Sequence, residues 1–280
     1  IIIEGLNLKR FIAEEKVEAL SMTLEMPRLE VFRDKRIEED TTVVKLMPQQ
    51  LMELSKQIIE LDTLIVKEGM LTYREFPVKG MVPGEITFDQ FNAKMYPFRL
   101  GKFGEDRKKP EVEANFRINK VAPVKATVQM QFEDPYPIAV EAEVGAFDLP
   151  SINSILATNA FITVKRGMVR EGKWHFVVDK NEAIGEMTLK YNNLKVQLLD
   201  ERTLKDAGGR KGILTFVINA LALRKNNPRP IFNRLVIYVE RIPYKFVFNY
   251  MWKATFSGLM GSSGLMQPKI PKKEEEEDES

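Results

Sequence analysis

The chain has 280 residues, of which 44% are hydrophobic and 29% charged, a composition typical of a globular protein with a substantial core. It contains no cysteine, which excludes disulfide frameworks and cysteine-based zinc sites or nucleophiles. Residues 272–279 contribute −4 to the net charge of +2, so the rest of the chain carries about +6. These positive charges are scattered along the sequence, which argues against nucleic acid as a partner. An acidic lipid remains open as a partner.

The first residues, IIIEGLNL, read as the middle of a strand and lack an initiator Met. We therefore expect a fragment or processed product, from which any upstream targeting or anchoring segment is missing. Helical composition follows in residues 8–16 and in residues 48–57, where Pro48 suits the first turn of a helix. Nowhere does the sequence contain about eighteen consecutive apolar residues, so no membrane-spanning helix is expected.

Two phrases about a hundred residues apart are nearly the same. GEITFDQFNAKMY occupies Gly84–Tyr96, and GEMTLKYNNLKVQLL occupies Gly185–Leu199. The residues ahead of each also match, with VKEGM at 66–70 and VKRGM at 164–168. The repeated unit is predicted to be a strand, a connection and a second strand.

A weaker echo of Val31–Asp34 in Thr72–Glu75 indicates a third copy near the N-terminus. Such repetition favours layers stacked along one axis, with chance similarity between β-rich segments as the alternative. Equivalent glycines are expected to open a turn or bulge at the same place in two layers. The pairs are Gly69 with Gly167 and Gly84 with Gly185.

Three segments between residues 111 and 144 alternate between apolar and polar side chains. In Val124–Phe132 every even position is apolar, and the same alternation holds in residues 112–118 and 138–144. Pro135 and Pro137 mark a turn between the last two segments. The pattern predicts a meander of antiparallel strands, each with one polar and one apolar face.

The second half of the chain predicts further helices. Residues 149–157 have helical composition, and Asp148 suits the capping position before them. Residues 213–223 are apolar except for Thr215 and Asn219, which predicts a buried or interfacial helix, with a strand as the alternative.

Residues 246–261 predict a second C-terminal helix with a narrow polar stripe and a wide aromatic face. Such a face suits a membrane interface or a plug in an apolar groove, and packing onto the protein's own core is the alternative. The residues expected in this role are Phe248, Trp252 and Phe256. Residues 266–280 are predicted to form a disordered charged tail, so a single domain is expected over residues 1–265.

No combination of residues indicates catalysis. The only histidine, His175, lies in a strand-like segment. A general base needs a second residue that orients it, and the sequence indicates none, so we interpret His175 as a packed or surface residue. The glycine-rich stretch at 208–212 lacks the spacing of a phosphate loop. We therefore expect no enzymatic activity, no cofactor and no metal site.

The predicted strands present more apolar surface than the short helices can shield. Three architectures remain open: a sandwich of two sheets, a closed barrel, and a curled open sheet whose apolar concavity holds something. The fold class expected is mainly β, with a long curled antiparallel sheet or open groove of repeated strand layers, short helices and two C-terminal helices.

Several phrases in combination resemble the C-terminal region of bacterial AsmA-like envelope proteins. They include GxxxYxEF at Gly69–Phe76, DLPSINSIL at 148–156, GxMxLxYxNL from Gly185 and NYMWKATFSGL at 249–259, and the resemblance extends to about Leu265. It implies a long curled sheet with a hydrophobic groove, related to TamB-like and chorein-type bridge proteins. The family is not an enzyme family, so the resemblance implies no catalytic residue.

The resemblance implies a periplasmic protein, attached to the envelope membrane through a segment absent from this chain, that carries phospholipid between membranes or supports outer-membrane assembly. Expected partners are a phospholipid or other acyl lipid and envelope membrane proteins. The alternative is a structural or interaction domain with a closed core; a β-sandwich carbohydrate hydrolase ranks last because no pair of acids is apparent. The residues predicted to line a lipid groove are Val124, Val128, Met130, Phe132, Val140, Val144, Met187 and Leu189.

Overall fold

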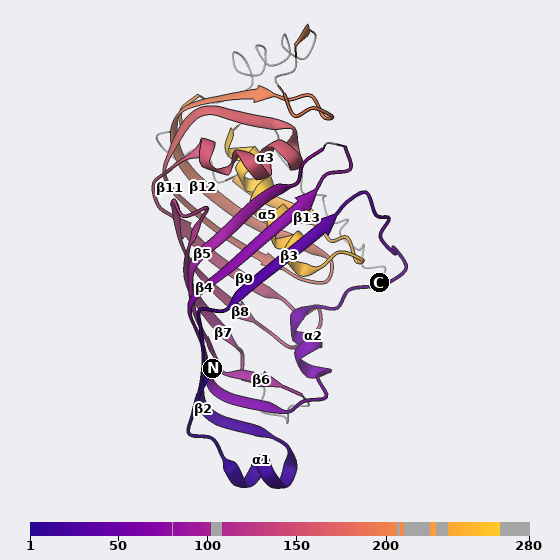
Figure 1. Ribbon diagram of the computed structural model, residues 1–280, viewed down its shortest axis with the longest axis vertical. Helices are drawn as coiled ribbons and strands as arrows, with labels where there is room; N and C mark the ends of the chain where they lie inside the picture. The colour runs from indigo at the N-terminus through magenta and orange to yellow at the C-terminus, as the bar shows by residue number, and fades with distance from the viewer. Residues whose placement is uncertain (80, 102–107, 206–207, 210–224, 228–234, 264–280) are drawn as a thin grey trace, which may run out of the picture.

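The computed structural model describes residues 1–79, 81–101, 108–205, 208–209, 225–227 and 235–263. One large mixed sheet, mostly antiparallel, dominates these residues (Figure 1). Its principal strand order is β1-β2-β4-β5-β7-β8-β9-β11-β12-β13, while β3 and β6 pair with β4, and β10 pairs with β11. The thirteen strands are β1 (Ile2–Glu4), β2 (Val17–Glu25), β3 (Arg28–Asp34), β4 (Ile59–Phe76), β5 (Gly84–Tyr96), β6 (Phe98–Leu100), β7 (Glu111–Ile118), β8 (Ala122–Met130), β9 (Ile138–Val144), β10 (Phe147–Asp148), β11 (Ile162–Val178), β12 (Glu182–Leu198) and β13 (Leu235–Glu240).

The sheet is neither closed nor strongly curled, since β1 and β13 lie at opposite ends of the described strand order. A closed barrel is therefore excluded, and the described strands form one sheet rather than two stacked ones. The mainly β prediction is confirmed, whereas the strong curl that was expected is absent.

The predicted meander is confirmed, because β7, β8 and β9 pair in sequence order and antiparallel. The prediction of a wholly antiparallel sheet is wrong at the N-terminal end. There β2 and β3 both run parallel to β4, with one constant register from Val17 beside Ile59 to Asp34 beside Phe76. Parallel neighbours need a crossover rather than a tight turn, and residues 35–58 supply it.

The helices are short apart from the last one. The first two predicted helices end earlier than expected, and residues 149–157 begin as a 3-10 turn. Asp148 precedes this turn, but its side chain makes no capping hydrogen bond. Residues 213–223 and 266–280, where another helix and a tail were predicted, lie outside the described residues. The described helices are α1 (Leu8–Glu14), α2 (Pro48–Glu53), η1 (Leu149–Ile152), α3 (Asn153–Ala160) and α5 (Val247–Ser263).

Both copies of the repeated phrase form a long antiparallel hairpin that follows a short helix. The first is β4 with β5 after α2, and the second is β11 with β12 after α3. Gly69 lies at a register irregularity of β4, and the pairing of β11 is also irregular on both sides of Gly167. The other two glycines differ in their neighbours: a Cβ on Gly84 would meet Thr158 of α3, whereas one on Gly185 would meet the backbone of β11.

The core lies on one face of the sheet, beneath the helices (Figure 1). One cluster of buried residues includes Leu156 of α3 and Tyr191 of β12. The second includes Met47, immediately before α2, and Ala254 of α5. Trp174 and Leu259 pack against both clusters, so the two are continuous.

Candidate functional site

The pairing of the strands aligns their apolar positions into continuous rows across the sheet. One row crosses five strands, from β5 through β7, β8 and β9 to β11. The neighbouring row consists mostly of small residues and ends at an aromatic ring. The first row is Met95, Val112, Val128, Val140 and Phe176; the second is Ala93, Ala114, Ala126, Ala142 and Trp174.

All eight residues predicted to line a groove are buried or partly buried. Val124, Val144 and Leu189 belong to the first core cluster, and Val140 and Met187 belong to the second. The remaining three residues are not members of either cluster. Val128 and Met130 are partly buried and pack against the second cluster. Phe132 lies beyond the end of β8 and is buried in a loop.

The position of α5 explains this burial. Tyr250, Ala254 and Gly258 are buried on one side of α5. A Cβ on Gly258 would lie 2.9 Å from Met187 Cε, so the helix approaches β12 closely at this point. The predicted C-terminal helix therefore packs on the apolar face of the sheet rather than standing apart from it.

The three aromatic residues singled out on α5 divide into two groups. Trp252 and Phe256 are partly buried and stack on each other, with ring centroids 6.3 Å apart. Phe248 is 44% exposed and lies at the edge of the apolar face. The centroid of its ring lies 5.7 Å from that of Tyr73 and 6.3 Å from that of Phe88.

A cavity of about 160 Å³ remains between the sheet, α3 and α5. Its lining is almost wholly apolar and includes Leu156, Leu189, Trp252 and Phe256. An apolar cavity of this size is large enough to hold a small apolar group and favours such a group over water.

A smaller pocket of about 30 Å³ lies next to this cavity. Three residues, Ile86, Ile155 and Trp252, line both spaces. Tyr73 and Glu75 also line the smaller pocket. The apolar cavity thus adjoins a pocket whose lining includes a carboxylate.

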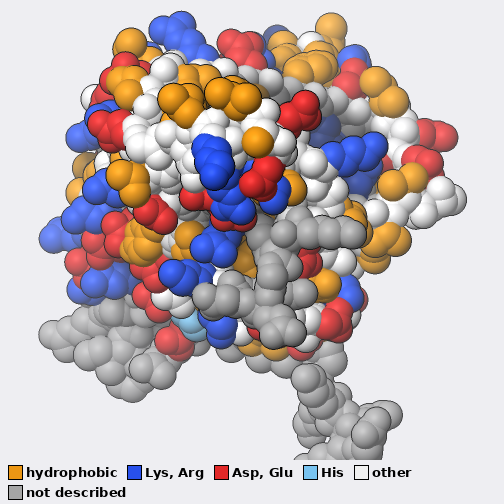
Figure 2. All heavy atoms as spheres, turned by 90° about the horizontal axis from the view of Figure 1, so that it is seen from below, with side chains coloured by type: hydrophobic (Ala, Val, Ile, Leu, Met, Phe, Trp, Pro, Cys, Tyr) orange, Lys and Arg blue, Asp and Glu red, His pale blue; other side chains and the backbone are white. Residues whose placement is uncertain are grey.

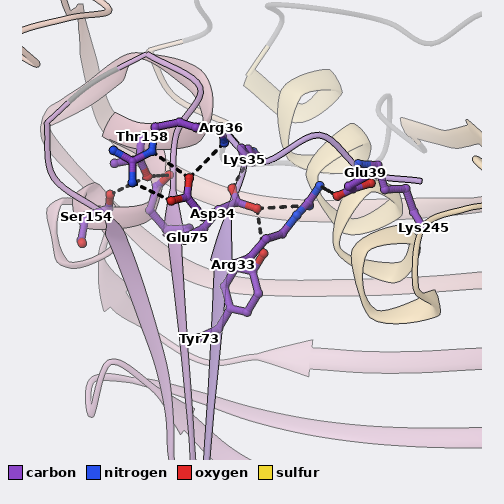
Figure 3. Close-up of polar contacts among 11 residues, drawn as sticks. Arg33, Asp34, Lys35, Arg36, Glu39, Tyr73, Glu75, Ser154, Thr158 and Lys245 are labelled. Atoms are coloured by element: carbon purple, nitrogen blue, oxygen red, sulfur yellow. Dashed lines mark hydrogen bonds and ion pairs between the residues drawn. The ribbon is translucent and has the colours of Figure 1, made fainter. Parts of the chain in front are cut away.

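Glu75 is the centre of a buried charged network at this position (Figure 3). It is only 2% exposed. The hydroxyl of Tyr73 donates to its Oε2 at 2.7 Å, Lys35 Nζ lies 2.5 Å from its Oε1, and Arg33 Nη1 lies 3.3 Å from its Oε2. Burial, followed by the hydrogen bond to Glu75, raises the pKa of Tyr73, so this phenol stays protonated and acts as a donor.

The network extends to α5 through a second carboxylate. Glu39 forms ion pairs with both Arg33 and Lys245, which lies just before the helix (Figure 3). Lys253 follows on α5 and is partly buried. Burial, and then the nearby charges of Lys245, Arg33 and Lys35, lower the pKa of Lys253.

The opposite face of the sheet is polar and hollowed, with a shallow open volume of about 1130 Å³. One cross-strand row there reads Lys94, Glu113, Thr127, Glu141, His175 and Glu186. His175 is exposed on this face, and no cluster of His, Asp and Glu suited to a metal ion occurs among the described residues. The alternating charges of this row are typical of a solvated face. At the lower end of the molecule, Figure 2 shows acidic, basic and hydrophobic side chains mixed over the surface.

The charged network was missed at the sequence level, although one signal for it exists. The alternate positions of β4 on the apolar face include Leu71, Tyr73 and Glu75. Glu75 therefore places a carboxylate at a position where the alternation predicts an apolar residue. The cations of the network come from two other parts of the chain, residues 33–35 and 245–253, which local periodicity does not bring together.

Comparisons with protein-family models, with curated protein sequences and with solved structures find no match to this chain. Within the part of the chain that the structure describes, no helix combines the length and the apolar character needed to cross a bilayer.

Proposed function

We propose that this chain is a non-enzymatic lipid-handling segment whose apolar sheet face binds the acyl chains of a lipid. The observation that carries the proposal is the apolar cavity of about 160 Å³ between the sheet and α5, next to a pocket whose lining includes Tyr73, Asn249 and the carboxylate of Glu75. An apolar space adjoining a polar one matches an amphiphile. Each CH₂ group moved from water into such a space contributes about 0.8 kcal/mol to binding.

In this proposal the sheet is an open groove built of repeated strand layers, and α5 is its plug. The two hairpins that follow α2 and α3 support the repeated layers. The burial of Tyr250, Ala254 and Gly258 supports the plug. A long acyl chain needs more room than the cavity offers, so α5 shifts when such a chain enters.

The cellular setting is proposed from the resemblance to AsmA-like proteins alone. In that setting the chain lies in the periplasm and is attached to the envelope membrane through a segment outside this sequence. It would carry phospholipid between the inner and outer membranes, or support outer-membrane assembly, together with envelope membrane proteins.

A substitution that fills the cavity tests acyl binding. Leu156 lines the cavity from α3, so Leu156→Phe should displace a bound acyl chain while leaving the fold intact. Val178→Ile is the matched control, because Val178 is buried on the same sheet face away from the cavity lining. The measurement is mass spectrometry of lipid that co-purifies with the chain, together with binding of a fluorescent fatty acid.

Loss of lipid and of probe binding in Leu156→Phe, with both retained in Val178→Ile, would support the proposal. Absence of lipid and of probe binding in the unmodified chain would favour the second candidate, a structural or interaction domain. That candidate is supported by the burial of groove residues such as Val124, Val144 and Met187 in the core beneath α5.

A further inference from the structure

We propose that the cationic rim, defined as Arg33, Lys35, Lys245 and Lys253, binds the phosphate of an anionic phospholipid whose acyl chain enters the apolar cavity. This inference rests on the proposed lipid function and names the class of lipid. It predicts that the chain prefers an anionic headgroup to a zwitterionic one.

The need for an added anion arises at Lys253. Arg33 and Lys245 share the carboxylate of Glu39, whereas among the described residues no carboxylate lies within ion-pair distance of Lys253. Asp34, which lies between Arg33 and Lys35 in the sequence, pairs with Arg36. Lys253 is partly buried, and burial together with the charges of nearby cations outweighs the opposing effect of Glu39 on its pKa. An additional anion would reduce the free-energy cost of this arrangement.

Further cations lie around the same end of α5. Lys45 Nζ lies 4.9 Å from the centroid of the Phe246 ring, and Arg241 donates to the backbone carbonyl of Lys45. Arg241 Nε is buried without a hydrogen-bond partner. These groups extend the positive field at the rim and make a dianionic phosphate a better ligand than a neutral headgroup.

The rim is linked to the cavity through the smaller pocket. Glu75 lines that pocket and lies within 3.3 Å of Arg33 and Lys35. Trp252 lines both the smaller pocket and the cavity. Asn249 precedes Lys253 by one helical turn and lines the smaller pocket with Tyr73 and Glu75. A phosphate held at the rim therefore lies next to the pocket that adjoins the apolar cavity.

Glu75 does not repel such a phosphate, because three donors already surround its carboxylate. Its role in this proposal is that of a positioning residue. By pairing with Arg33 and Lys35, it holds two long cationic side chains at the rim in a fixed arrangement, which lowers the entropy that they lose on binding an anion.

The test compares two soluble short-chain lipids, dihexanoyl phosphatidate and dihexanoyl phosphatidylcholine, by isothermal titration calorimetry with the full chain. We expect the phosphatidate to bind about tenfold more tightly. Lys253→Gln should reduce phosphatidate affinity about tenfold and leave phosphatidylcholine affinity unchanged, whereas Lys253→Arg should keep the preference. Lys173→Gln is the control for loss of one positive charge, because that side chain is 67% exposed on the opposite face.

The outcomes separate this inference from the proposed function. Equal affinity for the two lipids, or an equal loss of both in Lys253→Gln, would overturn the headgroup assignment while leaving acyl binding standing. Absence of binding to either lipid would overturn both proposals. Inorganic phosphate is titrated alone as a third ligand; if it binds as tightly as the phosphatidate, the rim is a free-anion site and the lipid assignment is wrong.

Discussion

At the scale of single residues, Glu75 is the most unusual side chain of the apolar face. It is a carboxylate at a position where its strand otherwise presents apolar groups, and it is buried. Burial of a charge is tolerated only when partners replace water, and Tyr73, Lys35 and Arg33 do so here. The network therefore contributes to stability only as a complete set.

Replacing Glu75 with Gln should lower the free energy of unfolding by about 1–3 kcal/mol, because charge-assisted hydrogen bonds are lost from a buried site. Glu85→Gln is the matched control: Glu85 pairs with Arg74, and both side chains are more than 40% exposed. It should change stability by less than about 1 kcal/mol. Chemical denaturation measures both. Equal effects of the two variants would show that burial adds nothing to the Glu75 network.

At the scale of elements, α5 decides whether the apolar face is open. The helix approaches β12 through small residues, and Gly258 packs directly against Met187. A larger residue there cannot be accommodated without moving the helix or repacking the Met187 side chain.

Gly258→Leu should destabilise the protein by about 1–3 kcal/mol and move Trp252 towards water, because α5 is pushed away from the sheet. The measurement is thermal unfolding together with the emission wavelength of Trp252, with Trp174 replaced by Phe in all variants. Phe246→Leu, at a side chain that is 65% exposed, should leave both readouts nearly unchanged. An unshifted Trp252 emission in Gly258→Leu would mean that Met187 repacks and the helix stays in place.

At the scale of the whole molecule, the sheet is unevenly supported along its length. Both core clusters draw their buried residues from Met47 onward, and β1, α1 and β2 contribute none to either. Several apolar side chains at this end, including Leu8, Ile12 and Leu20, are exposed. The N-terminal end is therefore held mainly by strand pairing, which alone protects a strand weakly.

Hydrogen exchange should reveal this gradient. Backbone amides of β2 should exchange about tenfold or more faster than those of β8, because local opening of β2 exposes less packed apolar surface. The comparison is well matched, since both strands have nine residues and lie between two neighbours. Equal protection of the two strands would indicate that the sheet opens only as a whole.

Local sequence patterns were enough to predict several of the strands and the apolar face of the sheet. The alternation in residues 111–144 sets which side chains share a face, because successive side chains of a strand point to opposite sides. The repeated phrases likewise predicted two strand pairs. The wide apolar face of residues 246–261 predicted a helix that buries one side against another apolar surface. Each of these features depends on neighbours in the chain.

What covers that face depends on contacts between segments that are far apart in the chain. Three contacts join distant segments. β2 and β3 pair in parallel with β4, and α5 packs against β12. Arg33 and Lys245 are brought together because both pair with Glu39. Local periodicity carries no information about such pairings, because it fixes the direction of a side chain and not its partner. The apolar positions of the candidate site could therefore be predicted from the sequence. The packing of α5 over them, the cavity and the cationic rim could not, because they depend on tertiary contacts.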